Sequence, residues 1–324
     1  SSTAMPRLDS AWAISNVSRA LSGCRISEGP DANAATTSQR LVSDLDPGMR
    51  TVLSSGAVPN GAGHKSVTVT SLMAGTIGVM CGRYALKEDP KVIAQDYNVA
   101  QAAMSDGSLA SLASETVPVT QMTSEAIAPS YNIAPTHMVP AVLLHDDLVT
   151  LAGFSWGLVP SWSKDPAIGS RMINARVETV TEKPSFRSAI QKRRCIVPAN
   201  GWYEWEKAGA KKVPHYFSAT DDAILGMAGM FESWTAPDGV VLWSVTILTT
   251  QAQPHIEHIH DRMPVLVMPE LRETWLAPGP APLEVILDGA AKYDRVQEWA
   301  VGSSVGNVRN NTAHLIEPEE TTLF

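Results

Sequence analysis

The chain contains 324 residues, carries a formal net charge of −8, and has 44% hydrophobic and 18% charged residues, an ordinary globular balance. This charge excludes a protein coated uniformly with basic side chains, so any contact with nucleic acid must come from a local basic patch. No apolar run reaches the roughly 18–20 residues that a membrane span needs. The three cysteines, Cys24, Cys81 and Cys195, are too sparse for a disulfide framework and fit a reducing cytoplasm.

Residues 1–79 differ in composition from the rest of the chain. Trp12 is the single aromatic residue among them, and Ser, Ala, Gly, Thr and Val dominate without sustained periodicity. Such a segment buries too little apolar surface to offset the entropy lost on ordering. We therefore expect residues 1–79 to be disordered or marginally structured, as a mis-assigned extension upstream of a start at Met80 or as a leader that is removed.

From Cys81 onward the chain reads as a mixture of strands and helices. The apolar spacing over Lys91–Met104 predicts a helix, and the Ser/Thr/Ala-rich residues 107–128 indicate an insertion or flexible loop. Short β-like runs between Pro and Gly predict a mostly antiparallel core, and three later segments predict helices, which together favour an α+β fold. The predicted strands are Val139–Leu144, Val149–Trp156, Arg194–Val197, Gly201–Trp205, His215–Ser218, Val241–Leu248 and Met263–Met268, and the later helices are Lys183–Gln191, Pro269–Trp275 and Leu283–Tyr293.

The string Met80-Cys81-Gly82-Arg83-Tyr84 is the first that suggests chemistry. An initiator Met is removed efficiently when a small residue such as Cys follows it. If translation begins at Met80, the mature chain therefore begins with Cys81. An N-terminal cysteine carries an amine and a thiol on neighbouring carbons, and its α-amine has a pKa of about 7.7–8.0. The amine can condense with an aldehyde, and the thiol can then close a five-membered thiazolidine. Cys81 considered alone fits a buried apolar cysteine equally well.

Three further strings contain candidate site residues. Asn174 lies in Met172-Ile-Asn-Ala-Arg-Val-Glu-Thr179, where an amide can orient an amine or cap a turn. Glu204 lies between Tyr203 and Trp205 on a predicted strand, a setting suited to proton transfer unless the side chain faces solvent.

The third string, His255-Ile-Glu-His-Ile-His-Asp-Arg-Met-Pro264, contains three histidines. It lacks the ligand spacing of a firm zinc site, so we expect no metal and no other cofactor. His260, beside Asp261 and Arg262, is better interpreted as an acid or base.

Taken together, these strings resemble the SOS-response-associated peptidase (SRAP) family of abasic-site processing proteins. The resemblance covers residues 81–318, leaving 319–324 as a tail, and its motifs occur in the family's order. These are Cys-Gly-Arg, Tyr131-Asn-Ile-Ala-Pro135, Trp156-Gly-Leu-Val-Pro-Ser-Trp162, Asn-Ala-Arg-Val-Glu-Thr, Arg193-Arg-Cys-Ile-Val-Pro198, Gly201-Trp-Tyr-Glu-Trp205 and His-Asp-Arg-Met-Pro. The resemblance implies an α+β domain around a twisted, barrel-like, mostly antiparallel sheet flanked by helices.

The resemblance also implies roles for individual residues. Cys81 matches the cysteine that bonds to the ring-opened sugar of an abasic site, and Asn174 matches the asparagine that positions its amine. Glu204 matches the glutamate that shuttles protons, and His260 the histidine that assists Schiff-base chemistry and reversal. Arg83, Arg176 and Arg262 match arginines that contact the DNA backbone near the lesion.

A local excess of positive charge between Arg171 and Arg194 agrees with binding of single-stranded DNA. Seven basic residues there face two acidic ones: Arg171, Arg176, Lys183, Arg187, Lys192, Arg193 and Arg194 against Glu178 and Glu182. A solvated helix face explains Lys192 and Arg193 equally well. Trp162 and Pro160 are candidates for stacking against bases.

We expect a cytoplasmic monomer, nucleoid-associated when it is bound to DNA, that crosslinks to abasic sites in single-stranded DNA and has replication-fork proteins as further candidate partners. One alternative is an N-terminal-nucleophile cysteine peptidase that releases Cys81 by cleaving its own chain, with Glu204 or His260 as base. A second alternative is a single-stranded DNA binder without catalysis.

Overall fold

The computed structural model describes residues 82–105, 108–109, 116–118 and 128–319. The chain divides into two units, Ser1–Thr76 and Ile77–Phe324, and every described residue belongs to the second. Cys81, the expected leader and most of the expected insertion at 107–128 lie outside the described residues. Within the described part of the chain, no helix has both the length and the apolar character needed to cross a membrane.

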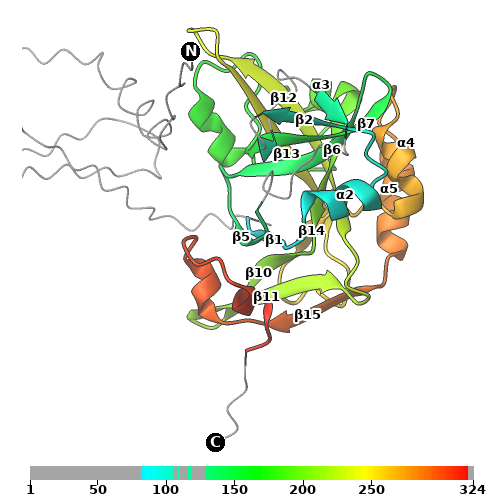
Figure 1. Cartoon of the computed structure of the whole chain (residues 1–324). Coiled ribbons are helices and arrows are strands. Elements are labelled where there is room, and N and C mark those ends of the chain that lie inside the picture. The colour runs from blue at the N-terminus through cyan, green and yellow to red at the C-terminus, as the bar shows by residue number, and fades with distance from the viewer. Residues whose placement is uncertain (1–81, 106–107, 110–115, 119–127, 320–324) are drawn as a thin grey trace, which may run out of the picture. The chain divides into compact units, whose positions relative to one another are not determined.

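A closed barrel forms the centre of the fold (Figure 1). Its strands pair in the order β13 (Val241–Gln251), β12 (Leu225–Thr235), β9 (Arg194–Ala199), β6 (Met138–His145) and β7 (Leu148–Trp156). These neighbours are antiparallel, and a parallel pairing of β7 with β13 closes the ring. The remaining strands of this sheet are β2 (Gln101–Ser105), β3 (Ser108–Leu109), β4 (Thr116–Pro118), β8 (Asn174–Arg176) and β14 (Arg262–Pro264).

A second sheet of five antiparallel strands packs beside the barrel. Its order is β15 (Val296–Ala300), β11 (Lys211–Ala219), β10 (Gly201–Ala208), β1 (Tyr84–Leu86) and β5 (Ser130–Ile133). One face contributes Trp202 and Phe217 to the main core, with their rings stacked 5.0 Å apart. The other face carries Tyr203 and Tyr216, which pack with residues of the C-terminal segment in a separate cluster.

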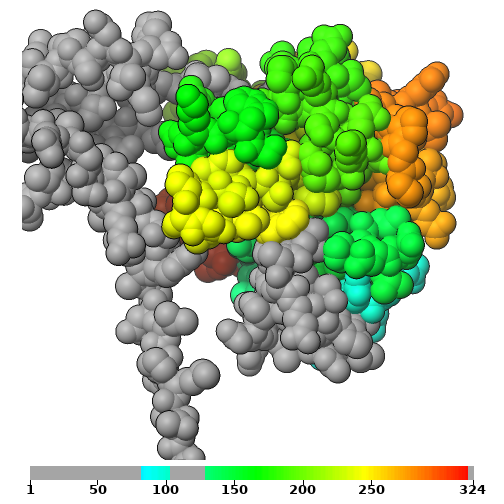
Figure 2. Space-filling model, turned by 90° about the horizontal axis from the view of Figure 1, so that it is seen from above, coloured from blue at the N-terminus to red at the C-terminus, as the bar shows by residue number. Residues whose placement is uncertain are grey.

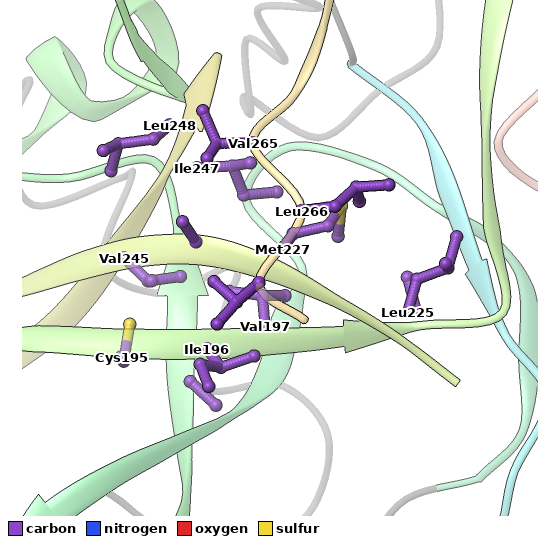
Figure 3. Packing of buried hydrophobic residues seen from close by; sticks show 14 of the residues in the cluster. Cys195, Ile196, Val197, Leu225, Met227, Val245, Ile247, Leu248, Val265 and Leu266 are labelled. Atoms are coloured by element: carbon purple, nitrogen blue, oxygen red, sulfur yellow. The ribbon is translucent and has the colours of Figure 1, made fainter. Parts of the chain in front are cut away.

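The barrel interior is filled by aliphatic side chains from its own strands. Figure 3 shows residues of β9, β12 and β13 converging with Val265 and Leu266. Cys195 lies among them as a buried free thiol, and burial raises its pKa far above the usual range, which disfavours the reactive thiolate.

Short helices and 3-10 turns accompany the sheets, with α3 and α4 packed against β9. Seen from above, the surface of the β12–β13 hairpin (yellow) borders the green surface, and α4 and α5 (orange) form the opposite side (Figure 2). The helices are α2 (Pro90–Asp96), α3 (Arg187–Lys192), α4 (Arg272–Leu276) and α5 (Leu283–Lys292), with 3-10 turns η2 (Pro166–Arg171), η3 (Pro269–Leu271), η4 (Ser303–Gly306) and η5 (Ala313–Ile316).

The predicted α+β class with a barrel-like, mostly antiparallel sheet is confirmed. The predicted helix over Lys91–Met104 was wrong in its second half, because α2 ends at Asp96 and β2 begins at Gln101. Asn98 has a φ of 51°, a left-handed conformation that Asn tolerates and that stops a helix.

The predicted strand Met263–Met268 overlaps β14 (Arg262–Pro264) in its first two residues. The predicted helix Lys183–Gln191 begins too early, because α3 runs from Arg187 to Lys192. The long strand β12 was missed because it is buried almost throughout and lacks alternation.

A close approach of two glycines shapes the segment that leads from β7 to β8. Gly157 has a φ of +125°, and a Cβ placed there would lie 2.6 Å from the carbonyl oxygen of Gly169. The amide of Leu158 donates to the carbonyl of Met172 at 3.1 Å in the same region. These contacts hold η2 against the end of β7, so the loop carrying Trp162 begins and ends at defined points.

Replacing Gly157 with alanine tests this packing. The substitution Gly157→Ala should lower the free energy of unfolding by about 1–3 kcal/mol, because it adds a clash to a backbone conformation that favours glycine. Urea denaturation measures the loss. Gly239→Ala is the matched control, since Gly239 has a φ of +87° but no atom within 4 Å of the added Cβ. Equal losses in both variants would contradict the account.

Candidate active site

The start of the described chain lies beside Glu204. β1 pairs with β10 through Tyr84 and Trp202, and the amide of Tyr203 donates to the carbonyl of Arg83 at 2.9 Å. Because the strands are antiparallel, each step back from Tyr84 moves one step forward along β10. Gly82, the first described residue, therefore lies toward Glu204.

Glu204 is a buried carboxyl group with 2% exposure. Side chains alternate along a strand, so Glu204 shares its face with Trp202, which belongs to the main core. Tyr203 packs in the second cluster, with Trp205 against it, on the opposite face. The residues that flank Glu204 in sequence, Tyr203 and Trp205, therefore lie on the opposite face of the strand and do not enclose its carboxyl group.

Asn174 is the first residue of β8, a three-residue strand that pairs in parallel with β13. The carbonyl of the preceding Ile173 accepts hydrogen bonds from Trp156 Nε1 at 3.0 Å and from the amide of Ile247 at 3.1 Å. Ala175 points into the core, whereas Asn174 is half-buried and Arg176 exposed. Asn174 and Arg176 therefore lie on the outward face, and the first tryptophan of the Trp-Gly-Leu-Val-Pro motif fixes their backbone.

His260 ends a turn that is anchored by two isoleucines. Ile256 and Ile259 are buried, while His255 and His258 are exposed. The three histidines of this string therefore do not converge. In the described part of the chain, no group of three His, Cys, Asp or Glu side chains could hold a metal ion.

The surroundings of His260 favour the neutral ring. Burial lowers the pKa of His260, and the smaller opposing effect of Asp261 does not reverse the shift. Nδ1 accepts a hydrogen bond from the amide of Arg262 at 3.1 Å, which leaves the proton of the neutral ring on Nε2. Lys207 of β10 is close enough to lower the pKa further, so β10 and the His260 turn are neighbours.

Glu178 links the segment that follows β8 to Arg262 at the start of β14. Arg262 donates to both carboxylate oxygens of Glu178, at 2.5 and 2.9 Å, and to the carbonyl of Thr249 at 2.7 Å. The Arg262 guanidinium lowers the pKa of the Glu178 carboxyl, and Arg176 adds to the effect. Asn174, Arg176, His260 and Arg262 are thus gathered at one end of β13.

Arg83 is committed to contacts inside the protein. It donates to Asn132 Oδ1 at 2.7 Å and to the carbonyl of Val305 at 2.8 Å. Asn132, 1% exposed, donates in turn to the carbonyls of Val305, Asn307 and Asn310. Sequence reasoning missed this role of Asn132, whose only signal was its place in the Tyr-Asn-Ile-Ala-Pro motif.

The basic residues between Arg171 and Arg194 divide into surface and interior groups. Arg171 and Arg176 are exposed, as are Lys183, Arg187 and Lys192. Arg194 is buried and donates to the carbonyls of Ile190, Gln191, Trp275, Ala277 and Gly279, where it caps the ends of α3 and α4. Arg194 therefore does not belong to a surface patch.

Arg193 is paired with Glu232 at 2.5 Å. Trp162 is 60% exposed on the loop before η2, and the neighbouring carbonyl of Ser163 accepts from Trp234 Nε1 at 2.7 Å. Pro160 is buried, which removes it as a stacking surface.

The lowered pKa of His260 predicts a dependence of stability on pH. The unfolded chain takes up a proton on this histidine as pH falls through about 6.5, before the folded protein does, so the free energy of unfolding drops below that pH. His260→Gln should therefore lose less stability between pH 7 and pH 5 than the unsubstituted protein. Urea midpoints at both pH values measure this, with the exposed His258→Gln as control. A steeper loss in His260→Gln would contradict the assignment.

Comparisons with known proteins place this geometry in a family. Residues 80–308 match the family model described as SOS response associated peptidase (SRAP). Abasic site processing protein YoaM of Bacillus subtilis is 37% identical over 194 residues, which are 59% of this chain and 86% of that protein. Abasic site processing protein YoqW of Bacillus subtilis is 34% identical over 241 residues, 74% of this chain and 99% of that protein.

A solved structure of a Bacteroides thetaiotaomicron protein shares the fold. Its TM-score is 0.60 at 23% identity, and the match covers 74% of this chain and all of that chain. The family match includes the strands of the barrel and every candidate residue from Cys81 to Arg262. The chain belongs to the SOS response associated peptidase (SRAP) family.

Proposed function

We propose that this protein captures abasic sites in single-stranded DNA by forming a thiazolidine crosslink through Cys81 as its first residue. The pairing of β1 with β10 is the observation that carries this proposal, because it directs the chain at Gly82 toward the buried carboxyl group of Glu204. Cys81 is one residue further. The curated relatives YoaM and YoqW are both named abasic site processing proteins.

The first step opens the sugar. Glu204 accepts the proton of the hydroxyl on the anomeric carbon, the bond from that carbon to the ring oxygen breaks, and the ring oxygen takes up the proton. The products are an aldehyde and a free hydroxyl. A carboxyl group held out of bulk water on a rigid strand is suited to moving a proton both ways.

The second step joins protein and DNA. The neutral α-amine of Cys81 adds to the aldehyde, and loss of one water gives an imine. The thiol then adds across the carbon–nitrogen double bond, which forms a carbon–sulfur bond and leaves the thiol proton on nitrogen. Asn174 orients the amine, and His260, neutral at pH 7, relays protons in the imine step and in reversal.

The DNA lies on the surface that carries the exposed residues Arg171, Arg176 and Trp162. Exposed Arg171 and Arg176 contact phosphates, and exposed Trp162 stacks on a base. Arg83 and Arg262 are held by Asn132 and Glu178, so we assign them a role in shaping the site rather than the main contacts to phosphate. Holding the lesion here lowers the entropic cost of bringing aldehyde and aminothiol together.

The crosslinking activity is tested with single-stranded DNA that contains one abasic site. Protein whose first residue is Cys81 should give a slower band on denaturing electrophoresis, and Cys81→Ala should abolish the band. Cys195→Ala is the control, because that thiol is buried in the core and should leave the band unchanged. A band that persists in Cys81→Ala would mean that another nucleophile reacts.

The chemistry requires a free amine on Cys81, so the full chain with residues 1–80 in place should not form the band. The peptidase alternative predicts instead that the full chain cleaves itself before Cys81, and that Glu204→Gln and His260→Gln block this cleavage. The crosslinking proposal does not require such self-cleavage. Equal binding and no covalent product in every variant would favour the non-catalytic alternative.

A further inference from the structure

Trp162 lies in a tight turn within the segment that joins β7 to η2. The amide of Ser163 donates to the carbonyl of Pro160 at 2.9 Å, which closes a four-residue turn with Ser161 and Trp162 at its centre. Pro160 is buried, whereas Trp162 is 60% exposed. Residues 160–163, here the Trp162 turn, therefore present one large aromatic side chain to solvent.

The last residue of the Trp162 turn is attached to β12. Trp234 Nε1 donates to the carbonyl of Ser163 at 2.7 Å, and Trp234 is buried, with 8% exposure. The hydroxyl of Ser163 donates to the carbonyl of Asp165 at 2.8 Å, just before η2 begins. The carbonyl of Ser163 is therefore held by a buried side chain that follows it by 71 residues in the chain.

The residue before the Trp162 turn is attached to β13. The amide of Val159 donates to Oγ of Ser244 at 2.8 Å, and this hydroxyl donates in turn to the carbonyl of Glu232 on β12 at 3.4 Å. Ser244 is fully buried, and it is the cross-strand partner of Glu232. Two buried side chains of the β12–β13 hairpin, Trp234 and Ser244, thus hold the backbone on both sides of the turn. We call this pair the hairpin latch.

The hairpin latch is itself anchored in the barrel. Phe231, three residues before Trp234, packs its ring against Phe154 of β7 and Trp243 of β13, with centroids 5.1 and 6.1 Å apart. The carbonyl of Phe231 accepts from Nε of Arg193 at 3.2 Å. A donor carried by a strand packed in this way restricts the loop that it holds. Neither attachment of the latch involves a charged group, so salt should not weaken it.

We propose that Trp234 and Ser244 are positioning residues that hold Trp162 ready to stack on a base of single-stranded DNA. A flexible turn would have to be ordered when DNA binds, and this ordering would offset part of the affinity that stacking provides. With the hairpin latch in place, the turn is ordered when the protein folds. The proposal rests on the proposed function for the identity of the ligand, but not for the order of the turn in the free protein.

Backbone ¹⁵N relaxation of the full chain tests the latch without DNA. Trp234→Phe keeps an aromatic ring but removes the donor to Ser163, so the order parameter of the Trp162 amide should fall from about 0.85, typical of rigid backbone, to below about 0.6. Trp299→Phe is the matched control, because Trp299 Nε1 donates to the carbonyl of Ile316 at 2.9 Å from β15. It should leave the Trp162 amide rigid. An unchanged order parameter in folded Trp234→Phe would overturn the proposal.

Binding of a labelled, undamaged single-stranded oligonucleotide, followed by fluorescence anisotropy, tests the consequence for DNA. Trp234→Phe should weaken binding about 2- to 10-fold, as expected when one more side chain must be ordered on binding. The loss should be the same at low and high salt, because the latch is uncharged. In a Trp162→Ala background, Trp234→Phe should cause no further loss, since the ring that it positions is gone. A further loss of the same size there would overturn the positioning role.

Thermal denaturation checks that each variant folds. If Trp234→Phe does not fold, Ser244→Ala, which removes the other attachment, is judged by the same two measurements. If the unsubstituted protein does not bind the oligonucleotide, the proposed function fails, while the relaxation data still decide whether the latch orders the turn. If binding is normal and folded Trp234→Phe binds equally well, the positioning role fails while the proposed function stands.

Discussion

The antiparallel pairing of β1 with β10 is the constraint on which the rest of the site depends. β1 has only three residues, yet it lies inside the second sheet, between β5 and β10. Tyr84, 1% exposed, packs its ring against Trp156 with centroids 5.3 Å apart. A strand held on both edges and by its side chain cannot slip, so the backbone at Gly82 is directed toward Glu204. The same tryptophan fixes Ile173 and hence Asn174.

The electrostatics of the site follow from the way β10 runs from the core toward solvent. Trp202 of β10 is in the dry core, Glu204 is buried two residues later, and Glu206 is partly exposed. A strand that leaves the core in this way presents one carboxyl group at the boundary, where it is shielded from bulk water yet close to other ionisable groups. His260 is held neutral by burial, whereas His215 faces carboxylates on both nitrogens. The two imidazole rings thus have opposite surroundings.

The sequence predicted the fold class and most central strands because Pro and Gly delimit them and their composition is strongly β-like. It failed where tertiary contacts override local pattern. Residues 101–105 have helical spacing, but pairing with β7 makes them a strand. Arg194 reads as part of a basic surface, but it satisfies the carbonyls at two helix ends. Cross-strand neighbours such as Glu204 and His215 depend on register, which one sequence does not reveal.

The central claim is that Cys81 reacts through both its amine and its thiol. Tandem mass spectrometry of the crosslinked peptide, after nuclease and protease digestion, tests it most directly. The account predicts a peptide that begins at Cys81, carries the sugar remnant with loss of one water, and has neither a free amine nor a free thiol on that residue. A sugar remnant on any other residue, or on a Cys81 still preceded by Met80, would contradict it.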